Sequence, residues 1–255
     1  MAAFLRRKAG IFMKQSTFFR VLFYIIGLLV LALGLTLNTK TGLGVSPIIS
    51  VAYSTAVISG HFGNMTLALY SLFVVIELIL HLIREHRYVE ESHGALSQAG
   101  KRDRKLIFLM DILQIPLSLI FTRFLNAFSA LIPALYSGSE SSAGEMAFRV
   151  IVLVIAIILT GIGAAMSLNM RIVPNPGDGI VQAIADTAHK SVGFTKNCFD
   201  VLNISITITL SLTFAGHLIG IGVGTILAMI GVGRTIAVFN HFTYDKMKQL
   251  AGIEN

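Results

Sequence analysis

The chain has 255 residues, of which 55% are hydrophobic and only 13% are charged, and its mean hydropathy is +0.78. So little polar surface cannot cover a water-soluble domain of this size, which excludes an ordinary soluble protein and indicates a polytopic membrane protein in a lipid bilayer. The net charge of +7 would suggest nucleic-acid binding in a soluble chain. Here the basic residues lie between apolar runs, where they orient membrane helices, so we expect no nucleic-acid partner.

Six segments have the roughly 20 apolar residues that a bilayer crossing requires. They are 18–37, 65–83, 106–125, 146–168, 197–214 and 218–239. The first follows a basic stretch that resembles the start of a signal peptide, but no small-residue cleavage site follows Leu37, so we expect a retained helix. Two shorter segments, 45–59 and 177–192, each follow a break that contains glycine and proline.

The distribution of Lys and Arg indicates whether these two short segments cross the membrane. Three arginines inside or at the edge of spans, Arg123, Arg149 and Arg234, are left aside. If all eight segments cross, the other 17 basic residues divide into 9 inside and 8 outside, whereas 16 lie inside if neither short segment crosses. Because cytoplasmic loops carry an excess of positive charge, this count favours six spans and two non-crossing helices, with both termini cytoplasmic.

The order of the segments repeats as long, short, long, long, and then the same again. LGLTLNTKTGLGVSPIISVA in the first half resembles GAAMSLNMRIVPNPGDGIVQAIA in the second, with Asn38 and Asn169 ending the first span of each half. Three spans per repeat is an odd number, so the second repeat is inverted relative to the first. We therefore predict an all-α membrane protein with six transmembrane helices and two short re-entrant half-helices, arranged as two inverted-topology repeats.

The predicted organisation follows from this repeat. It comprises a basic cytoplasmic N-terminus at 1–17, a first repeat at 18–136 with its re-entrant helix at 45–59 and a cytoplasmic loop at 84–105, an extracytoplasmic linker at 137–145, a second repeat at 146–242 with its re-entrant helix at 177–192, and a cytoplasmic tail at 243–255.

The second break, RIVPNPGDGIVQAIADTAHK, is the most informative stretch. Pro174 and Pro176 block helix through Asn175, and the following glycines release the backbone, so a short helix is expected to begin at about Asp178. Polar residues then recur at helical spacing on one face of that helix. An alternative is an amphipathic helix that lies in the headgroup plane.

Three motifs carry a resemblance to a known group. TKTGLGVSPIISVA, VPNPGDGIVQAI and GIGVGTILAMIGVG resemble the YczE/YitT-type family of bacterial integral membrane proteins, and the resemblance extends over about 20–240. It implies a location in the bacterial cytoplasmic (plasma) membrane and agrees with the repeat, but it implies no particular substrate. Members of that family often carry an acidic residue shortly after the first Ser-Pro, whereas Ile48 and Ile49 follow Pro47 here.

Asp178 is the first candidate for a functional group. A carboxylate at the start of a half-helix is stabilised by the helix dipole and by free amides, and it can still bind a cation or a proton. The alternative is that Asp178 only caps the helix. In an inverted repeat the two breaks approach each other, so we expect a cavity between them that takes a solute with a positive or hydrogen-bond-donating group. The predicted substrate-binding residues are Asp178, Ser46, Asn175, Gln182, Glu77 and Asn203.

Ionisable residues inside the long spans are costly unless they are paired or wet. Asp200 follows Lys196 by one helical turn, which predicts a local ion pair, and Asp111 is close enough to the start of its span to reach the headgroups. Glu77 has His81 one turn later, a spacing that suits either a proton relay or a local hydrogen bond.

Enzyme motifs are absent from the sequence. Intramembrane aspartyl proteases have a Gly-x-Gly-Asp motif, which would need glycine where Asn175 stands, and neither a Cys/His metal spacing nor a phosphate-binding loop is present. We expect no catalytic residue, metal site or cofactor. The predicted function is a secondary transporter or channel for a small solute or ion bound near the midplane. The alternative is a membrane scaffold or accessory protein that assists another membrane or biosynthetic system, and either role is compatible with a homo-oligomer.

Overall fold

The computed structural model describes the backbone of residues 2–91, 98–136 and 142–253, and the side chains of 16–84, 107–136 and 142–253. These residues form eight helices and no strand. Six helices are long: α1 (Ala2–Lys40), α3 (Phe62–Glu91), α4 (Gln98–Leu131), α5 (Ala143–Asn169), α7 (Val192–Ala215) and α8 (Val223–Ala251). Each contains a segment that is long and apolar enough to cross a membrane, which confirms the prediction of an all-α protein with six transmembrane helices.

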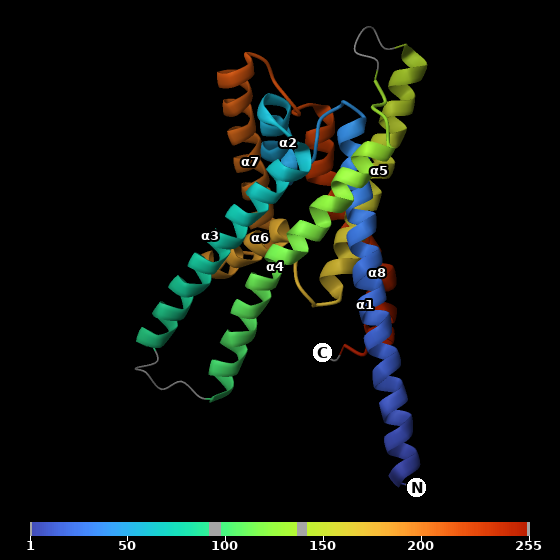
Figure 1. Ribbon diagram of the computed structural model, residues 1–255, viewed down its shortest axis with the longest axis vertical. Coiled ribbons are helices and arrows are strands. Elements are labelled where there is room, and N and C mark those ends of the chain that lie inside the picture. The colour runs from blue at the N-terminus through green and yellow to red at the C-terminus, as the bar shows by residue number, and fades with distance from the viewer. Residues whose placement is uncertain (1, 92–97, 137–141, 254–255) are drawn as a thin grey trace.

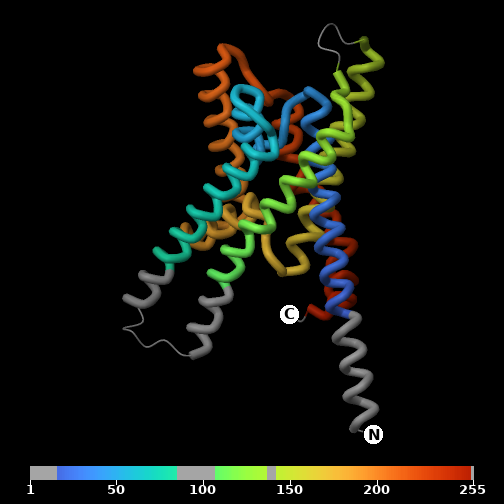
Figure 2. Tube along the Cα trace, viewed as in Figure 1, coloured from blue at the N-terminus to red at the C-terminus, as the bar shows by residue number. Residues whose placement is uncertain are grey.

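The two short helices are α2 (Pro47–Ser59) and α6 (Pro176–Ala188), with 13 residues each. At about 1.5 Å per residue such a helix is roughly 20 Å long, which is less than the thickness of a hydrocarbon core. Both lie between the long helices (Figure 2), where α2 packs on α3 and α7, and α6 on the same two helices. Neither short helix is therefore long enough to be a seventh span.

The ends of the long helices gather at two ends of the molecule (Figure 1). The start of α1 and the end of α8 lie toward one end, together with the end of α3 and the start of α4. The end of α4 and the start of α5 lie at the opposite end. This arrangement fits six crossings with two short helices that do not cross.

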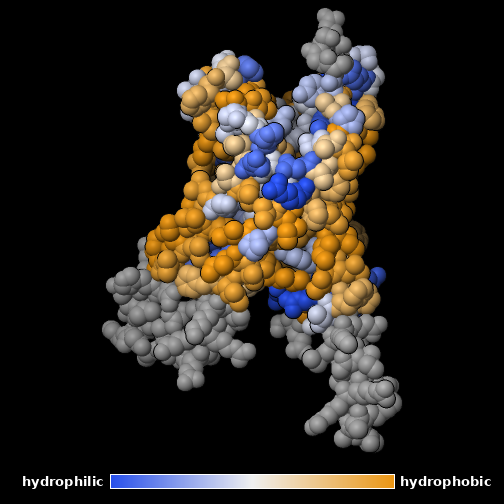
Figure 3. Space-filling model, viewed as in Figure 1, coloured by the Kyte–Doolittle hydropathy of each residue, from blue (hydrophilic) through white to orange (hydrophobic). Residues whose placement is uncertain are grey.

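Much of the outer surface of the bundle is apolar. On the face shown in Figure 3, apolar side chains cover the flanks and the lower half of the described helices, and a group of hydrophilic side chains lies in the upper centre. Leu72 on α3 is 53% exposed and Ile151 on α5 is 58% exposed. Because soluble proteins rarely expose such continuous apolar area, this surface suits contact with lipid.

The helix contacts of the two halves correspond. Within the halves, α1 packs on α4 as α5 packs on α8, and α2 packs on α3 as α6 packs on α7. Between the halves, α2 packs on α7 as α6 packs on α3, and α1 packs on α5. Exchange of the two halves therefore maps these contacts onto one another and the α1–α5 contact onto itself, whereas the contact of α1 with α8 has no comparable counterpart among the described residues.

Helices α1 and α5 cross with their backbones in contact. A Cβ atom on Gly34 would lie 2.5 Å from the backbone nitrogen of Thr160, and one on Gly27 would lie 2.7 Å from that of Ser167. Gly163 of α5 likewise lies directly against the backbone of Leu31. Small residues permit such close helix pairs in membranes, so glycine fixes the central pair of the bundle.

Candidate functional site

The second break is held in place by polar groups of α1. The Tyr24 hydroxyl donates to the carbonyl oxygen of Val173 at 2.8 Å. The Arg20 guanidinium donates through Nε to the carbonyl of Met170 at 2.8 Å and through Nη2 to that of Arg171 at 2.7 Å. These carbonyls follow the end of α5 and precede two prolines, so helix amides do not satisfy them. Side chains of α1, in the first half of the chain, therefore fix the backbone path of the second break.

Helix α6 begins earlier than the sequence predicts. Asn175 is the N-cap, and its side chain accepts a hydrogen bond from the backbone N–H of Gly177 at 3.1 Å. Pro176 takes the first helical position, where its missing N–H needs no partner and its fixed φ suits a helix. The expected start at about Asp178 and the interpretation of Asp178 as the cap are both wrong. Asp178 instead lies in the first turn, where the helix dipole still favours a carboxylate.

The first break is joined to the start of α8 by backbone hydrogen bonds. The N–H of Gly224 donates to the carbonyl of Leu43, and the N–H of Val45 donates to that of Gly220, each at 2.8 Å. Gly44 has a φ of +119°, a backbone conformation that suits only glycine. The glycines at the start of α8 thus serve close backbone packing, since a Cβ atom on Gly222 or Gly224 would lie within 3.0 Å of the Leu43 carbonyl oxygen.

The starts of the two short helices meet. A Cβ atom on Gly177 would lie 2.8 Å from Cγ1 of Ile48, which is the second residue of α2. Both breaks line one cavity of about 390 Å³, a volume that suits a small molecule. Five of the predicted substrate-binding residues lie on its wall, namely Ser46, Asn175, Asp178, Gln182 and Glu77. Ser46 is the N-cap of α2, but its side chain makes no capping hydrogen bond.

Asn203 is the predicted residue that the structure does not bring to this cavity, whose described lining lacks it. Its side-chain amide donates to the carbonyl of Phe199, one turn earlier in α7, at 2.8 Å. Asn203 is 2% exposed, so this bond satisfies a polar group buried within the bundle. Asn203 therefore has a structural role in the interior of the bundle and not a role at the cavity.

The structure adds an ion pair to the wall. Nζ of Lys196 lies 2.9 Å from Oδ2 of Asp200, which confirms the predicted local pair, and both residues line the cavity. Oδ1 of Asp200 is buried without a hydrogen-bond partner in the part of the chain that the structure describes. Helical spacing predicts this ion pair but carries no information on whether the pair faces the cavity.

Asp178 faces both members of this ion pair. Burial raises the pKa of Asp178 above its ordinary value, the Lys196 ammonium lowers it, and the Asp200 carboxylate raises it again, with a net increase. Tyr70 of α3 also lies beside Asp178 and Asn175. The start of α6 therefore presents a carboxyl group that accepts a proton more readily than an exposed aspartate.

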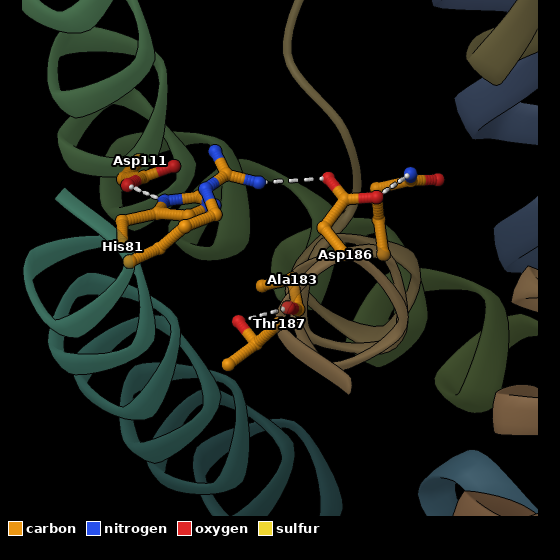
Figure 4. A network of polar contacts seen from close by, with 7 residues as sticks. His81, Asp111, Ala183, Asp186 and Thr187 are labelled. Atoms are coloured by element: carbon orange, nitrogen blue, oxygen red, sulfur yellow. Dashed lines mark hydrogen bonds and ion pairs between the residues drawn. The ribbon is translucent and has the colours of Figure 1, made fainter. Parts of the chain in front are cut away.

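A second polar group lies where α3 and α4 face α6. His81 of α3 and Asp111 of α4 form a hydrogen bond of 2.6 Å between Nδ1 and Oδ2, as Figure 4 shows. Asp111 is 2% exposed, so the expectation that it reaches the headgroups is wrong. Glu77 and Gln114 lie next to this pair and directly against Gly179 of α6. His81 is thus paired across two helices.

A comparison with protein-family models matches the family of unknown function DUF6198 over residues 18–241, which is most of the chain. The chain belongs to that family. Comparisons with curated proteins and with solved structures give no match. The resemblance to the YczE/YitT-type family is not tested by this match, and it stays a prediction.

In this DUF6198 protein the cavity wall combines charge with apolar surface. Besides the Tyr70 phenol, its ionisable groups among the described residues are Glu77, His81, Asp178, Lys196 and Asp200. Three of these are carboxylates and one is a lysine that is already paired with Asp200. The wall is therefore suited to a ligand that brings positive charge or hydrogen-bond donors.

Proposed function

We propose that this DUF6198 protein is a secondary transporter or channel, and that its small solute binds in the cavity between the two breaks, near the midplane of the bacterial cytoplasmic membrane. The observation that carries the proposal is the meeting of the starts of α2 and α6 at one cavity. Non-helical backbone is tolerated at membrane depth only where protein or water surrounds it. Half-helix ends that face each other are how many transporters bind their solutes.

The proposal includes an inverted repeat. The corresponding helix contacts of the two halves support it. So does a reciprocal pair of arginines, because Arg20 of α1 donates to Met170 after α5 while Arg149 of α5 donates to Thr41 after α1. The two halves would then be related by a pseudo-two-fold axis in the membrane plane. The resemblance to the YczE/YitT-type family agrees with the same repeat.

The proposed orientation places both termini in the cytoplasm. Its support is the charge count, in which 16 of the 17 basic residues considered lie on the side of the termini when six helices cross. The cytoplasmic side would then be the end of the molecule at which α1 begins and α8 ends (Figure 1).

The proposed solute is a small cation or a molecule rich in hydrogen-bond donors. Asp178 supports this choice, because it lies on the cavity wall. The Lys196 ammonium attracts its carboxylate, and the Asp200 carboxylate repels it. A cationic group near Asp178 would offset the repulsion between the two carboxylates. We propose no covalent change of the solute and assign no catalytic residue.

A ligand screen by thermal unfolding of the purified protein tests the proposal, since a solute that binds only the folded state raises the melting temperature. Small amines, guanidines and polyols form the first set of solutes. We expect at least one solute to stabilise the wild type, and Asp178→Asn to abolish that stabilisation in a protein that still folds. The matched control is Asp245→Asn, which changes an exposed carboxylate on α8.

Two results would contradict the proposal. One is a screen in which no solute stabilises the protein, which would favour the scaffold role. The other is solute binding of wild-type strength by well-folded Asp178→Asn, which would remove Asp178 from the site.

A further inference from the structure

The four polar side chains between α3 and α4 share one small space. Glu77 and His81 are four residues apart on α3, and Asp111 and Gln114 are three residues apart on α4, so each pair lies on one face of its helix. One ligand atom from each of Glu77, His81 and Asp111 lies within 4.8 Å of the others. Two helices therefore bring together a set of groups that the linear sequence keeps apart.

Part of this cluster has unmet hydrogen-bonding capacity. Oε2 of Glu77 and both Oε1 and Nε2 of Gln114 are buried and make no hydrogen bond of good geometry among the described residues, although Gln114 and Asp111 lie beside the Glu77 carboxylate. Glu77 is 3% exposed and Gln114 is 0% exposed. Buried polar atoms without partners are uncommon in native proteins, and a bound ion or water is one of the usual reasons for them. These atoms are next to the His81–Asp111 pair and close to Gly179.

The charges of the cluster also call for a cation. Two carboxylates, Glu77 and Asp111, lie beside each other inside the helices, where an uncompensated negative charge is costly. Protonated His81 would balance one of these charges, and the other needs either a proton on Glu77 or a bound cation. A divalent cation bound to both carboxylates and to neutral His81 would balance the charge and use the unpartnered oxygens.

The donor set selects the class of metal. An imidazole nitrogen together with carboxylate and amide oxygens suits Zn²⁺ and its first-row neighbours, whereas Mg²⁺ and Ca²⁺ prefer oxygen ligands alone. Acidic and histidine residues that project inward from facing helices are also how helix bundles build metal sites.

We propose that Glu77, His81, Asp111 and Gln114 form a binding site for one divalent transition-metal ion at the wall of the cavity. No Cys/His spacing in the sequence indicates this site, because its ligands come from two helices and His81 and Asp111 are 30 positions apart. The prediction of no metal site rested on that missing spacing. The metal site does not depend on the proposed transport role. Glu77 and His81 also line the cavity, so the bound ion would lie beside the space assigned to the solute.

Titration of the metal-free full-length protein with Co²⁺ tests the site, with any affinity tag removed first. We expect one equivalent of Co²⁺ per chain, visible by d–d absorption, and displacement by Zn²⁺ but not by excess Mg²⁺. Glu77→Gln, His81→Gln and Asp111→Asn should each weaken Co²⁺ binding by more than ~10-fold, since even outer-shell changes weaken metal sites by about that factor.

Matched controls change the same residue types elsewhere. His217→Gln alters an exposed histidine, and Asp245→Asn alters an exposed aspartate. Both should bind Co²⁺ as tightly as the wild type. If Co²⁺ binding survives all three cluster substitutions unchanged, or if the controls weaken it equally, the proposal is wrong.

A measurement on the wild type covers the case in which a cluster variant does not fold. Bound Cu²⁺ should show electron paramagnetic resonance coupling to one histidine nitrogen, and that coupling should change when histidine is labelled with ¹⁵N. Failure of the wild type to bind one equivalent of metal, or a bound Cu²⁺ without nitrogen coupling, would overturn the site. Neither result bears on solute binding, so the two proposals fail separately.

Discussion

Gly179 of α6 lies so close to Glu77 of α3 that a Cβ atom on the glycine would be 2.7 Å from Oε2 of the carboxylate. The same Cβ atom would be 2.9 Å from Oε1 of Gln114. The backbone of α6 therefore covers the polar cluster directly, and this contact joins the second break to the interior of the first half.

Gly179→Ala should destabilise the protein. Alanine favours helix over glycine by about 1 kcal/mol. The atoms that its Cβ would meet end the flexible side chains of Glu77 and Gln114, but both side chains are buried and have little room to turn, so the extra volume costs about 1–3 kcal/mol and we expect a net loss. Thermal unfolding in detergent measures it. Gly233→Ala is the control, because a Cβ atom there would meet nothing within 4 Å. A Gly179→Ala protein as stable as Gly233→Ala would contradict the close contact.

Asp178 predicts a pH dependence of stability. Its folded-state pKa is raised above the ordinary value of 3.8, so protonated Asp178 contributes stability that is fully present below pH ~4 and is lost as pH rises through the folded-state pKa. Asp178→Asn cannot ionise and does not lose that contribution. We expect the melting temperature of Asp178→Asn relative to wild type to increase with pH over this window and then to level off.

The charged groups that face Asp178 are Lys196 and Asp200, and both must be kept in this experiment. Circular dichroism follows unfolding, because the chain contains no tryptophan. A difference in melting temperature that is the same at every pH would show that the carboxyl group titrates at its ordinary value.

Arg149→Met should destabilise the protein by about 1–3 kcal/mol, because it leaves the carbonyl of Thr41 without its charged donor at 2.7 Å. Arg149 is 7% exposed and its guanidinium also lies over the ring of Tyr136, so contacts are lost on both sides. Arg20→Met removes the reciprocal bonds to the second break and should act in the same direction.

Arg234→Met is the matched control for these two arginines, since Arg234 is exposed on α8. It should change stability by less than about 0.5 kcal/mol. Equal effects of all three substitutions would mean that loss of positive charge, and not loss of the two contacts, explains the result.

Cysteine labelling tests the membrane orientation. Single cysteines at Ser92 and Ser141, which lie outside the described residues, should be labelled from opposite sides of the membrane, with Ser92 cytoplasmic. Cys198 is exposed on α7 and must be replaced first. Labelling of both positions from one side would contradict six crossings, and an external Ser92 would reverse the proposed orientation.

The parts of the fold that the sequence predicted follow from chain length and hydropathy. Six spans and two short helices are fixed by where apolar runs of about 20 residues begin and end. The start of α6 was misplaced by two residues, because two prolines were taken to exclude helix when Pro176 in fact opens it. Local rules thus predicted the eight helices but not all of their bounds, since α8 begins at Val223, five residues after the predicted start of the last span, and α6 ends at Ala188, four residues before its predicted end.

The candidate site was only partly predictable. Ser46, Asn175, Asp178 and Gln182 could be placed on one cavity because they belong to the two breaks. The pair of His81 and Asp111 could not, because helical periodicity relates residues within one helix and carries no information on which helices become neighbours. The prediction that Asn203 lines the cavity was wrong for the same reason.

The close crossing of α1 and α5 limits how the two halves can move. Gly34 and Gly163 bring backbone against backbone, so sliding one half along the membrane normal would drive bulkier neighbours such as Leu31 into the opposite helix. Rotation about the crossing point meets no such obstacle. If the protein cycles between two openings, we therefore expect the halves to rock about this crossing as a fixed pivot, and not to slide past each other as in an elevator. The hydrogen bonds of Arg20 and Arg149 to backbone carbonyls lie at the two ends of the pair, where such rocking would move the halves most.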